Sequence, residues 1–391
     1  MDSVIVSDYG VTLAKTGDRL VVRGPRPRLE VIEGGPQLFL PLGLDNRRPA
    51  LKLVTSSGEK HPAEPLRHLG ANPAPRPPKA SADQIELPLF RVGHIVVASS
   101  GVSISTDLIE ACCERGIRLS FLTRSGKPFA MLSSPMLTAT VITRREQLAA
   151  YNDERGVEFA KAVVRGKLGN QAALLRYFGK YLKTAEPAAF ARISEIALRL
   201  IKGRNSAAKV SAPNVDEARE ALLSIEGSSG RNYWSAVREL LPKEIEFDSR
   251  EHRGATDPIN SALNYGYGIL YAQVWGAILN AGLEPFAGFL HVDRPGKPSL
   301  ILDLIEEFRQ PVVDRAIIAA IGKGTAIETQ GGLLSDASRR TIAQLVLERL
   351  ESEVIFRGQR HKLKSVVQLQ ARNLASALRG DGSYKAFSFK W

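Results

Sequence analysis

The sequence contains few cysteines and no long apolar run. Of its 391 residues two are cysteine, Cys112 and Cys113, and adjacent cysteines cannot bridge to each other without backbone strain. The chain is therefore not a disulfide scaffold and offers no thiolate metal cluster. No apolar stretch approaches the roughly 20 residues that span a bilayer, and the start, MDSVIVSDYG, lacks the basic and apolar regions of a signal peptide. These absences predict a cytoplasmic protein without a membrane partner.

Acidic residues are also scarce relative to basic ones, since the formal net charge is +12. Such an excess attracts a polyanion through long-range attraction and counterion release. It favours nucleic acid as a partner over an anionic membrane surface or charge that serves solubility alone. Hydrophobic residues at 44% and charged residues at 24% are typical of a globular protein, and the length favours two or three domains.

The first third of the chain is typical of β structure. Val-rich runs in SVIVSDYGVTLAKTGDRLVVRG predict two strands, and GHIVVASS and IRLSFLTRSGKPFAML predict more, the latter as a hairpin turning at Ser125-Gly126. Between them STDLIEACCERG predicts a short helix, with Ser105 or Thr106 as its N-cap and Gly116 beyond its end. We treat residues 24–85, which include the Pro-rich ANPAPRPPKASAD, as an insertion. After about Ser134 helical periodicity takes over, so we predict an α+β protein with a β-rich domain over 1–134 and a larger helical domain over 135–391.

The segment FLHVDRPGKPSLILDLIEEFR predicts a helix with one apolar and one acidic face. At 100° per residue, Asp303, Glu306, Glu307 and Gln310 fall opposite Ile301, Leu304, Ile305 and Phe308. An acidic stripe is usually a solvated face. Here His291 lies just before the turn that leads into the helix, so an imidazole and carboxylates could meet on one metal ion.

Two further segments carry candidate groups. In IEGSSGRNYW, Glu226 is followed by Gly227 and Gly230 within a helical pattern, where each Gly costs about 1 kcal/mol relative to Ala. Close approach of another protein or nucleic-acid backbone would explain them, and so would tight helix packing. In DPINSALNYGYGILY, Asp257 is the predicted N-cap and Pro258 the first helical residue. The stripe that follows could bind phosphates and orient metal ligands or form a polar helix interface; it contains Asn260, Asn264, Tyr267 and Tyr271.

Carboxylates together with an imidazole suit Mg²⁺ or Mn²⁺, with coordination positions left for water and phosphate. Such a metal polarises a phosphodiester, a reaction that also needs cations near the phosphate. The cations beside the candidate ligands in sequence are Arg231, Arg253, Arg294 and Lys297.

Four motifs in order resemble one family. GFLHVDRPGKPSLILDLIEEFRQPVVDR, IEGSSGRNYW, DPINSALNYGYGILY and LQARNLASALRGDGSYKAFSFKW together resemble the CRISPR-associated spacer integrase, the first-numbered Cas protein. The resemblance implies a β-sandwich-like N-terminal domain and an all-α catalytic domain. It implies Glu226, His291 and Asp303 as catalytic metal ligands. Glu306 stands where some members carry a second aspartate, which leaves direct ligation or a water-mediated role open. The resemblance also places Asn264 and Tyr265 near the site.

The activity implied is metal-dependent strand transfer, in which the 3′-hydroxyl of a captured double-stranded DNA fragment attacks a CRISPR repeat end. The implied partners are a second copy of the chain and a small ferredoxin-like protein, the second-numbered Cas protein. Two other readings remain. A transposon-encoded integrase of the same superfamily typically carries an added C-terminal DNA-binding region, whereas this sequence ends at YKAFSFKW, so we place it second. A non-catalytic DNA-organising subunit would not need Glu226, His291 and Asp303 together.

Overall fold

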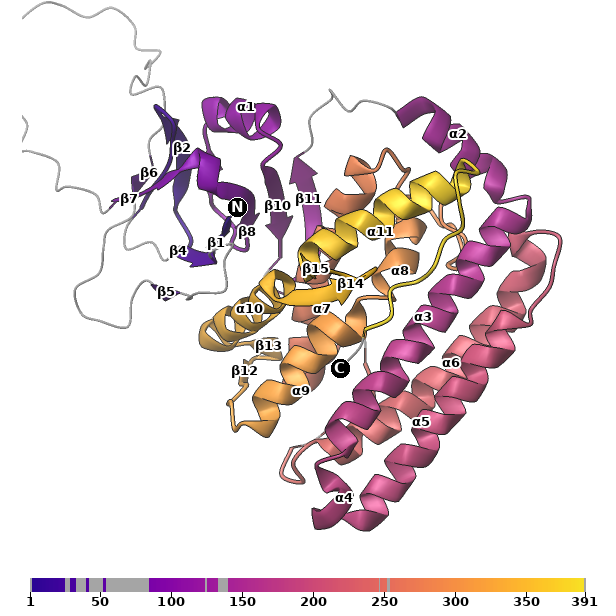
Figure 1. The fold of residues 1–391 in the computed structure, drawn as a ribbon. Helices are drawn as coiled ribbons and strands as arrows, with labels where there is room; N and C mark the ends of the chain where they lie inside the picture. Colours follow the sequence, from indigo (N-terminus) through magenta and orange to yellow (C-terminus); the bar gives the residue numbers. More distant parts are fainter. Residues whose placement is uncertain are drawn as a thin grey trace, which may run out of the picture. The chain divides into compact units, whose positions relative to one another are not determined.

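The chain divides into two compact units, Met1–Arg124 with Phe129–Ser134, and Ser125–Pro128 with Pro135–Trp391 (Figure 1). We call them the N-terminal unit and the helical unit. The computed structural model describes residues 2–24, 29–32, 40–41, 52–53, 84–123, 125–132, 140–245, 247–251 and 254–389. Most of the insertion predicted over residues 24–85 therefore lies outside the described residues.

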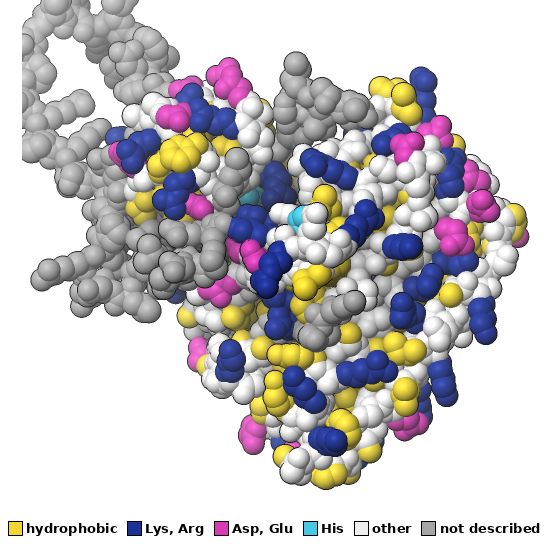
Figure 2. Space-filling model, viewed as in Figure 1, with side chains coloured by type: hydrophobic (Ala, Val, Ile, Leu, Met, Phe, Trp, Pro, Cys, Tyr) yellow, Lys and Arg dark blue, Asp and Glu magenta, His cyan; other side chains and the backbone are white. Residues whose placement is uncertain are grey.

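Positive charge is spread over the surface of the helical unit. Figure 2 shows Lys and Arg side chains across its visible face, with fewer Asp and Glu among them. Several acids are instead withdrawn into the interior, namely Asp303, Glu306, Glu307 and Asp314, each at most 4% exposed. Burial of these four acids makes the surface of the helical unit more positive than its sequence composition alone.

The N-terminal unit contains two β-sheets and a short helix. Among the described residues one sheet has the order β11-β10-β8-β1-β4-β5, and the other has β6-β3-β2-β9 with β7 paired to β3. Strand β8 lies parallel to both β1 and β10, with Val4 opposite Ile95. The strands are β1 (Asp2–Val6), β2 (Thr12–Thr16), β3 (Arg19–Arg23), β4 (Leu29–Ile32), β5 (Leu40–Pro41), β6 (Lys52–Leu53), β7 (Gln84–Pro88), β8 (Val92–Val97), β9 (Ser103–Ile104), β10 (Arg118–Leu122) and β11 (Pro128–Leu132).

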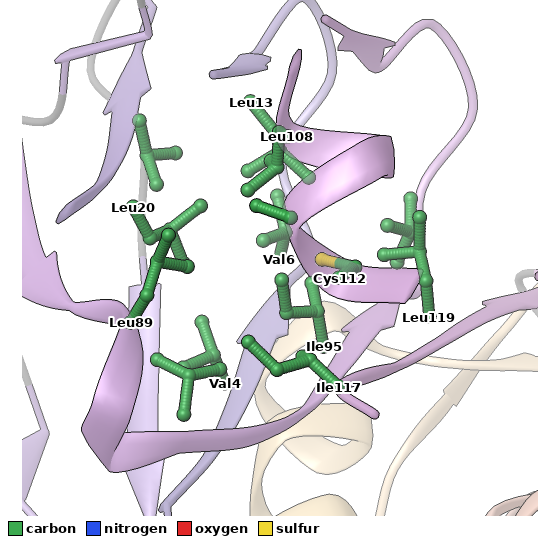
Figure 3. Close-up of a cluster of buried hydrophobic side chains, with 14 of the residues drawn as sticks. Val4, Val6, Leu13, Leu20, Leu89, Ile95, Leu108, Cys112, Ile117 and Leu119 are labelled. Carbon is green, nitrogen blue, oxygen red and sulfur yellow. The ribbon is translucent and has the colours of Figure 1, made fainter. Parts of the chain in front are cut away.

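Apolar side chains from both sheets and from helix α1 (Thr106–Glu114) form the core of this unit (Figure 3). Alternation along the strands sends Val4, Leu13 and Leu20 into this core, and α1 adds Leu108. Ser105 caps helix α1, and its Oγ accepts from the amide of Leu108 at 3.4 Å. The arrangement is sandwich-like, as the resemblance implied.

The N-terminal segment differs from the sequence prediction in one respect. Two Val-rich strands were predicted before residue 24, and the structure has three, because Thr12–Thr16 forms a strand of its own. Its sequence, TLAKT, carries no valine, but Leu13 and Ala14 are both fully buried. Pairing with β3 on one side and β9 on the other decides its conformation rather than local propensity.

The helical unit contains long helices and two short hairpins that the expectation of an all-α domain missed. The hairpins are β12 (Thr329–Gln330) with β13 (Leu333–Leu334), and β14 (Glu353–Phe356) with β15 (Gln359–Lys362). The helices are α2 (Thr140–Ala150), α3 (Glu154–Gly179), α4 (Leu182–Ala185), α5 (Pro187–Ala208), α6 (Val215–Leu240), α7 (Pro258–Asn280), α8 (Ser299–Ile305), the π-helix η2 (Arg309–Asp314), α9 (Arg315–Gly322), α10 (Asp336–Glu351) and α11 (Leu363–Leu378).

Side-chain N-caps set where three of the helices around the site begin. Helices α3, α5 and α6 pack side by side (Figure 1), and α7 packs against α8, η2, α10 and α11. Side chains of Asp153, Asn214 and Asp257 cap α3, α6 and α7, and Pro258 is the first residue of α7, as the sequence predicted. None of the helices in the described ranges is long and apolar enough to cross a membrane.

Candidate active site

A tight turn returns the chain from His291 to helix α8. Pro295 and Gly296 are its central residues, the amide of Lys297 donates to the carbonyl of Arg294 at 2.9 Å, and Gly296 has a φ of +72°. This is the pattern of a type II turn, in which only Gly adopts the third position without strain. After the turn, α8 begins at Ser299 and packs against the segment that carries His291.

Asp303 of α8 holds that segment in place. Its side chain is fully buried and accepts from three successive backbone amides, those of Phe289 at 2.6 Å, Leu290 at 3.1 Å and His291 at 2.9 Å. The same carboxylate lies 2.7 Å from Nδ1 of His291. An imidazole that donates from Nδ1 to a carboxylate keeps Nε2 as the free lone pair, which is the usual preparation of a metal-binding histidine. Nε2 has no hydrogen-bond partner among the described residues.

The hydrogen bonds of Asp303 argue against the ligand role expected for it. Both carboxylate oxygens already accept hydrogen bonds, and ligation would leave buried amides without an acceptor. Asp303 therefore fixes the ring of His291, and its ligation of a metal ion stays a prediction.

Glu226 and Glu306 converge on the ammonium group of Lys167. Lys167 lies on α3, Glu226 on α6, and Glu306 directly after α8. The lysine Nζ contacts Oε1 of Glu226 and lies 2.7 Å from Oε2 of Glu306. Burial lowers the pKa of Lys167, but the two carboxylates outweigh burial and raise it overall, so this lysine stays charged. Three separate elements thus bring two carboxylates and one cation to a single point.

Glu306 lies in a strongly positive environment. Its Oε1 pairs with Nε of Arg309 at 3.2 Å, and its side chain is 5% exposed. Burial alone would raise the pKa of Glu306, but Arg309 and Lys167 outweigh it and lower the pKa to about 2. Oε2 is buried outside hydrogen-bond geometry with any described group, although the ammonium of Lys167 is close. Glu306 is therefore ionised, and its Oε2 faces the ammonium group of Lys167.

The solvated acidic face considered from the sequence is wrong. Asp303, Glu306 and Glu307 are all buried, because α8 ends at Ile305 and the chain turns into η2, so the three carboxylates face different partners. Glu307 accepts from the hydroxyl of Tyr384 and from the amide of Phe387 at 2.6 Å. Burial raises the pKa of Glu307 to about 7, against the effect of these hydrogen bonds. Glu307 secures the C-terminal segment rather than the site.

A cavity of about 380 Å³ opens beside the two converging glutamates. It is lined by Lys167, Gln171, Glu226, Gly227, Gly230, Arg231, Trp234, Ser235, Asp248, Ser249, Arg250, Tyr267, Arg309 and Gln310. A Cβ added at Gly230 would meet nothing within 4 Å, and one at Gly227 would approach Arg231 at 4.0 Å. Tight helix packing therefore does not explain these glycines, and both line the cavity.

The polar stripe of α7 forms an interface within the protein. Asn260 accepts from Nη1 of Arg250 at 2.9 Å, and Asn264 accepts from Nη2 of the same arginine at 2.5 Å. Tyr267 donates to the buried carboxylate of Asp314. The stripe therefore holds Arg250 at the wall of the cavity, which supports the interface alternative, and phosphate binding by Asn264 stays a prediction.

The remaining predicted residues lie in several places. Arg231 is exposed and lines the cavity, while Arg294 is exposed and Lys297 half-buried at the turn before α8. Tyr265 is 3% exposed, and its ring contacts Gly126 of the loop Ser125–Pro128 in the same unit. Arg253 lies outside the described residues. The structure thus places Arg231 at the cavity and Tyr265 in the interior.

Among the residues that line the cavity, sequence reasoning missed Lys167, Gln171, Arg250 and Arg309. A signal for the first two was present in the sequence. Lys167, Asn170 and Gln171 are spaced i, i+3 and i+4 on a helix whose neighbouring residues are apolar, so three polar groups face the interior together. Arg250 precedes α7 in a loop without periodicity, and nothing in the sequence indicated its position.

The donor chemistry fits Mg²⁺ or Mn²⁺. Within the described ranges no three His, Cys, Asp or Glu side chains stand together as a ready metal site, and Lys167 lies between the two glutamates. Nevertheless two carboxylates converge on one cation, Glu306 interacts electrostatically with His291, and the ring of that histidine is fixed by Asp303. Oxygen donors with one imidazole are the ligands that these metals accept. Glu226, His291 and Glu306 would hold the ion, and ligation by Glu226, His291, Asp303 and Glu306 stays a prediction.

Comparisons with known proteins agree on one family. The family model described as CRISPR associated protein Cas1 matches residues 79–348. A CRISPR-associated endonuclease Cas1 of Archaeoglobus fulgidus is 38% identical over 308 residues, which are 74% of this chain and 87% of the relative. Among solved structures, a casposase bound to its integration product has a TM-score of 0.73 at 22% identity and is covered to 93%, with 99% of this chain covered. A Cas6-RT-Cas1–Cas2 complex has a TM-score of 0.65 at 16% identity, covering 98% of this chain and 36% of that one. The chain therefore belongs to the Cas1 family of CRISPR-associated proteins.

Proposed function

We propose that this protein is a metal-dependent DNA endonuclease and integrase of CRISPR adaptation. It joins the 3′-hydroxyl ends of captured DNA fragments to CRISPR repeat ends by transesterification. The observation that carries the proposal is the convergence of Glu226 and Glu306 on Lys167, beside a cavity that also carries arginines, with His291 interacting electrostatically with Glu306. The relative from Archaeoglobus fulgidus is named an endonuclease, which agrees with it.

Each part of the cavity has a role in this reaction. A Mg²⁺ or Mn²⁺ ion, when bound, would polarise the phosphodiester as a Lewis acid. Arg231 and Arg250 provide guanidinium groups to a phosphate, and Asn264 holds Arg250 in place. Trp234 offers an aromatic surface on which a base could stack. No protein nucleophile is needed, since the DNA hydroxyl or a water attacks the phosphate.

We further propose that the protein acts as a homodimer with a small ferredoxin-like partner, Cas2. The solved complex that contains both Cas1 and Cas2 supports this partner. The net charge of +12 and the spread of Lys and Arg in Figure 2 support binding to double-stranded DNA. Arg294 and Lys297 at the exposed turn are proposed phosphate contacts, as is Arg253. A cytoplasmic location stays a prediction.

A strand-transfer assay tests the proposal. The purified protein, Cas2, a short duplex with free 3′-hydroxyl ends and a plasmid with a CRISPR repeat are incubated with Mn²⁺ or with EDTA. The wild type is compared with His291→Ala and with a matched control, His361→Ala, which removes an imidazole from the hairpin strand β15. We expect joining with Mn²⁺ in the wild type and the control, and none with EDTA or in His291→Ala.

The same assay separates the proposal from a DNA-organising subunit. A scaffold would bind DNA but would join no ends in any variant or with any metal. Joining by His291→Ala at the wild-type rate would contradict the assigned site. A transposon-type integrase would differ in its target, because joining would occur on a plasmid without the repeat as readily as on one with it.

A further inference from the structure

The ammonium group of Lys167 lies where a bound metal ion would lie. It contacts Glu226 and is 2.7 Å from Glu306, and the lysine side chain is 13% exposed. The two carboxylates come from different elements, so without a cation between them their charges would repel in a largely buried place. Lys167 therefore stabilises the convergence of the two glutamates in the protein as it folds.

This position cannot be shared with a divalent cation. Carboxylate oxygens bind Mg²⁺ at about 2.0–2.1 Å, so an ion that takes both glutamates as ligands needs the space that the ammonium group fills. Two cations at one point would also repel strongly in a low-dielectric interior. We propose that Lys167 is a built-in counterion, which holds Glu226 and Glu306 together until a divalent cation displaces it. The inference rests on the metal site of the proposed function.

The cavity offers the displaced lysine another position. Gln171 lies one turn further along α3, on the same face as Lys167. Its Oε1 is buried without a hydrogen-bond partner, as is Oε1 of Gln310, and both residues line the cavity. These carbonyl oxygens are acceptors that suit an ammonium group. A lysine turned towards them remains in the cavity, where it can also contact a DNA phosphate.

The displacement has a consequence for charge. In the described arrangement Glu226 and Glu306 face Lys167 and Arg309, so two negative groups meet two positive ones. A divalent cation adds two positive charges to this group without removing any. Phosphates of bound DNA would offset them, so DNA and metal should each strengthen the binding of the other.

Calorimetric titration with Mn²⁺ tests the proposal without measuring activity. The proteins are the wild type, Lys167→Met and a matched control, Lys161→Met. Lys161 lies on the same helix but pairs with Glu158, so its replacement removes a positive charge away from the two glutamates. In Lys167→Met no ammonium group competes with Mn²⁺ for the two carboxylates. We therefore expect the Kd for Mn²⁺ to fall about tenfold or more in this variant. The control should bind as the wild type does. Unchanged or weaker binding by folded Lys167→Met would overturn the proposal.

A second measurement uses the wild type alone and so does not depend on the variant folding. Amine acetylation is followed residue by residue by mass spectrometry, with Mn²⁺ or with EDTA. We expect Lys167 to be acetylated faster when Mn²⁺ is bound, since its pairing is lost, while Lys161 does not change. Equal labelling of Lys167 under both conditions would refute displacement. If neither the wild type nor Lys167→Met binds Mn²⁺, the result refutes the proposed metal site, on which the role of the lysine depends.

Discussion

Gly230 offers a test in which stability and function should change in opposite directions. It lies in the interior of helix α6, and a Cβ built there meets nothing within 4 Å. Replacing Gly by Ala in a helix interior without a clash gains about 0.5–1 kcal/mol, because the unfolded chain loses conformational freedom. Gly230→Ala should therefore raise the free energy of unfolding by about 0.5–1 kcal/mol, and Tm by about 2 °C for a unit of this size.

Function should move the other way. Gly230 lines the cavity beside the converging glutamates, so its added methyl group takes space that a DNA strand needs. We expect weaker DNA binding and slower strand transfer, although the protein is more stable. Thermal unfolding, DNA titration and the strand-transfer assay, all on the same preparation, measure the three quantities.

Gly268 is the matched control for this substitution. It also lies in a helix interior, in α7, but a Cβ there would overlap the carbonyl oxygen of Gly126 and lie 2.6 Å from its carbonyl carbon. Because backbone atoms cannot move aside cheaply, Gly268→Ala should lower stability by about 1–3 kcal/mol. A loss of stability in Gly230→Ala, or a gain in Gly268→Ala, would refute the reasoning. Unchanged DNA binding in Gly230→Ala would show that DNA does not enter the cavity at that point.

Three further substitutions test the other groups of the site. Asp303→Asn can keep about two of the four hydrogen bonds that the carboxylate accepts, so urea unfolding should show a loss of about 3 kcal/mol, against less than about 1 kcal/mol for exposed Asp293→Asn; equal losses would contradict the positioning role. Glu306→Gln should weaken Mn²⁺ binding by at least about a hundredfold in calorimetry, whereas Glu307→Gln, one residue on, should not change it; the reverse result would exchange the two roles. Asp314→Asn removes the carboxylate that accepts hydrogen bonds from two tyrosine hydroxyls, so the free energy of unfolding of the variant should fall by about 1.5–3 kcal/mol. An unchanged free energy of unfolding would mean that the carboxyl is already protonated in the folded protein.

Helix α8 explains why only part of the candidate site could be predicted from the sequence. Helical spacing placed Asp303, Glu306 and Glu307 on one face, and the structure gives each a different partner. The reason is that α8 ends after Ile305 and a π-helix follows, so 100° per residue does not describe the later positions. Periodicity measures the direction of a side chain within one regular helix, and it fails where the helix changes type.

The sequence by itself determined the class of fold, the helix caps at Ser105 or Thr106 and at Asp257, and Glu226 and His291 as candidates for the site. Such features depend on local chemistry, because a cap, a turn or a motif acts within a few residues of the chain. Only the tertiary structure decided that Lys167 lies between Glu226 and Glu306 and that Asp303 holds the ring of His291. These contacts join helices far apart in the sequence, and the packing of those helices, rather than any local preference, sets the distances between their side chains.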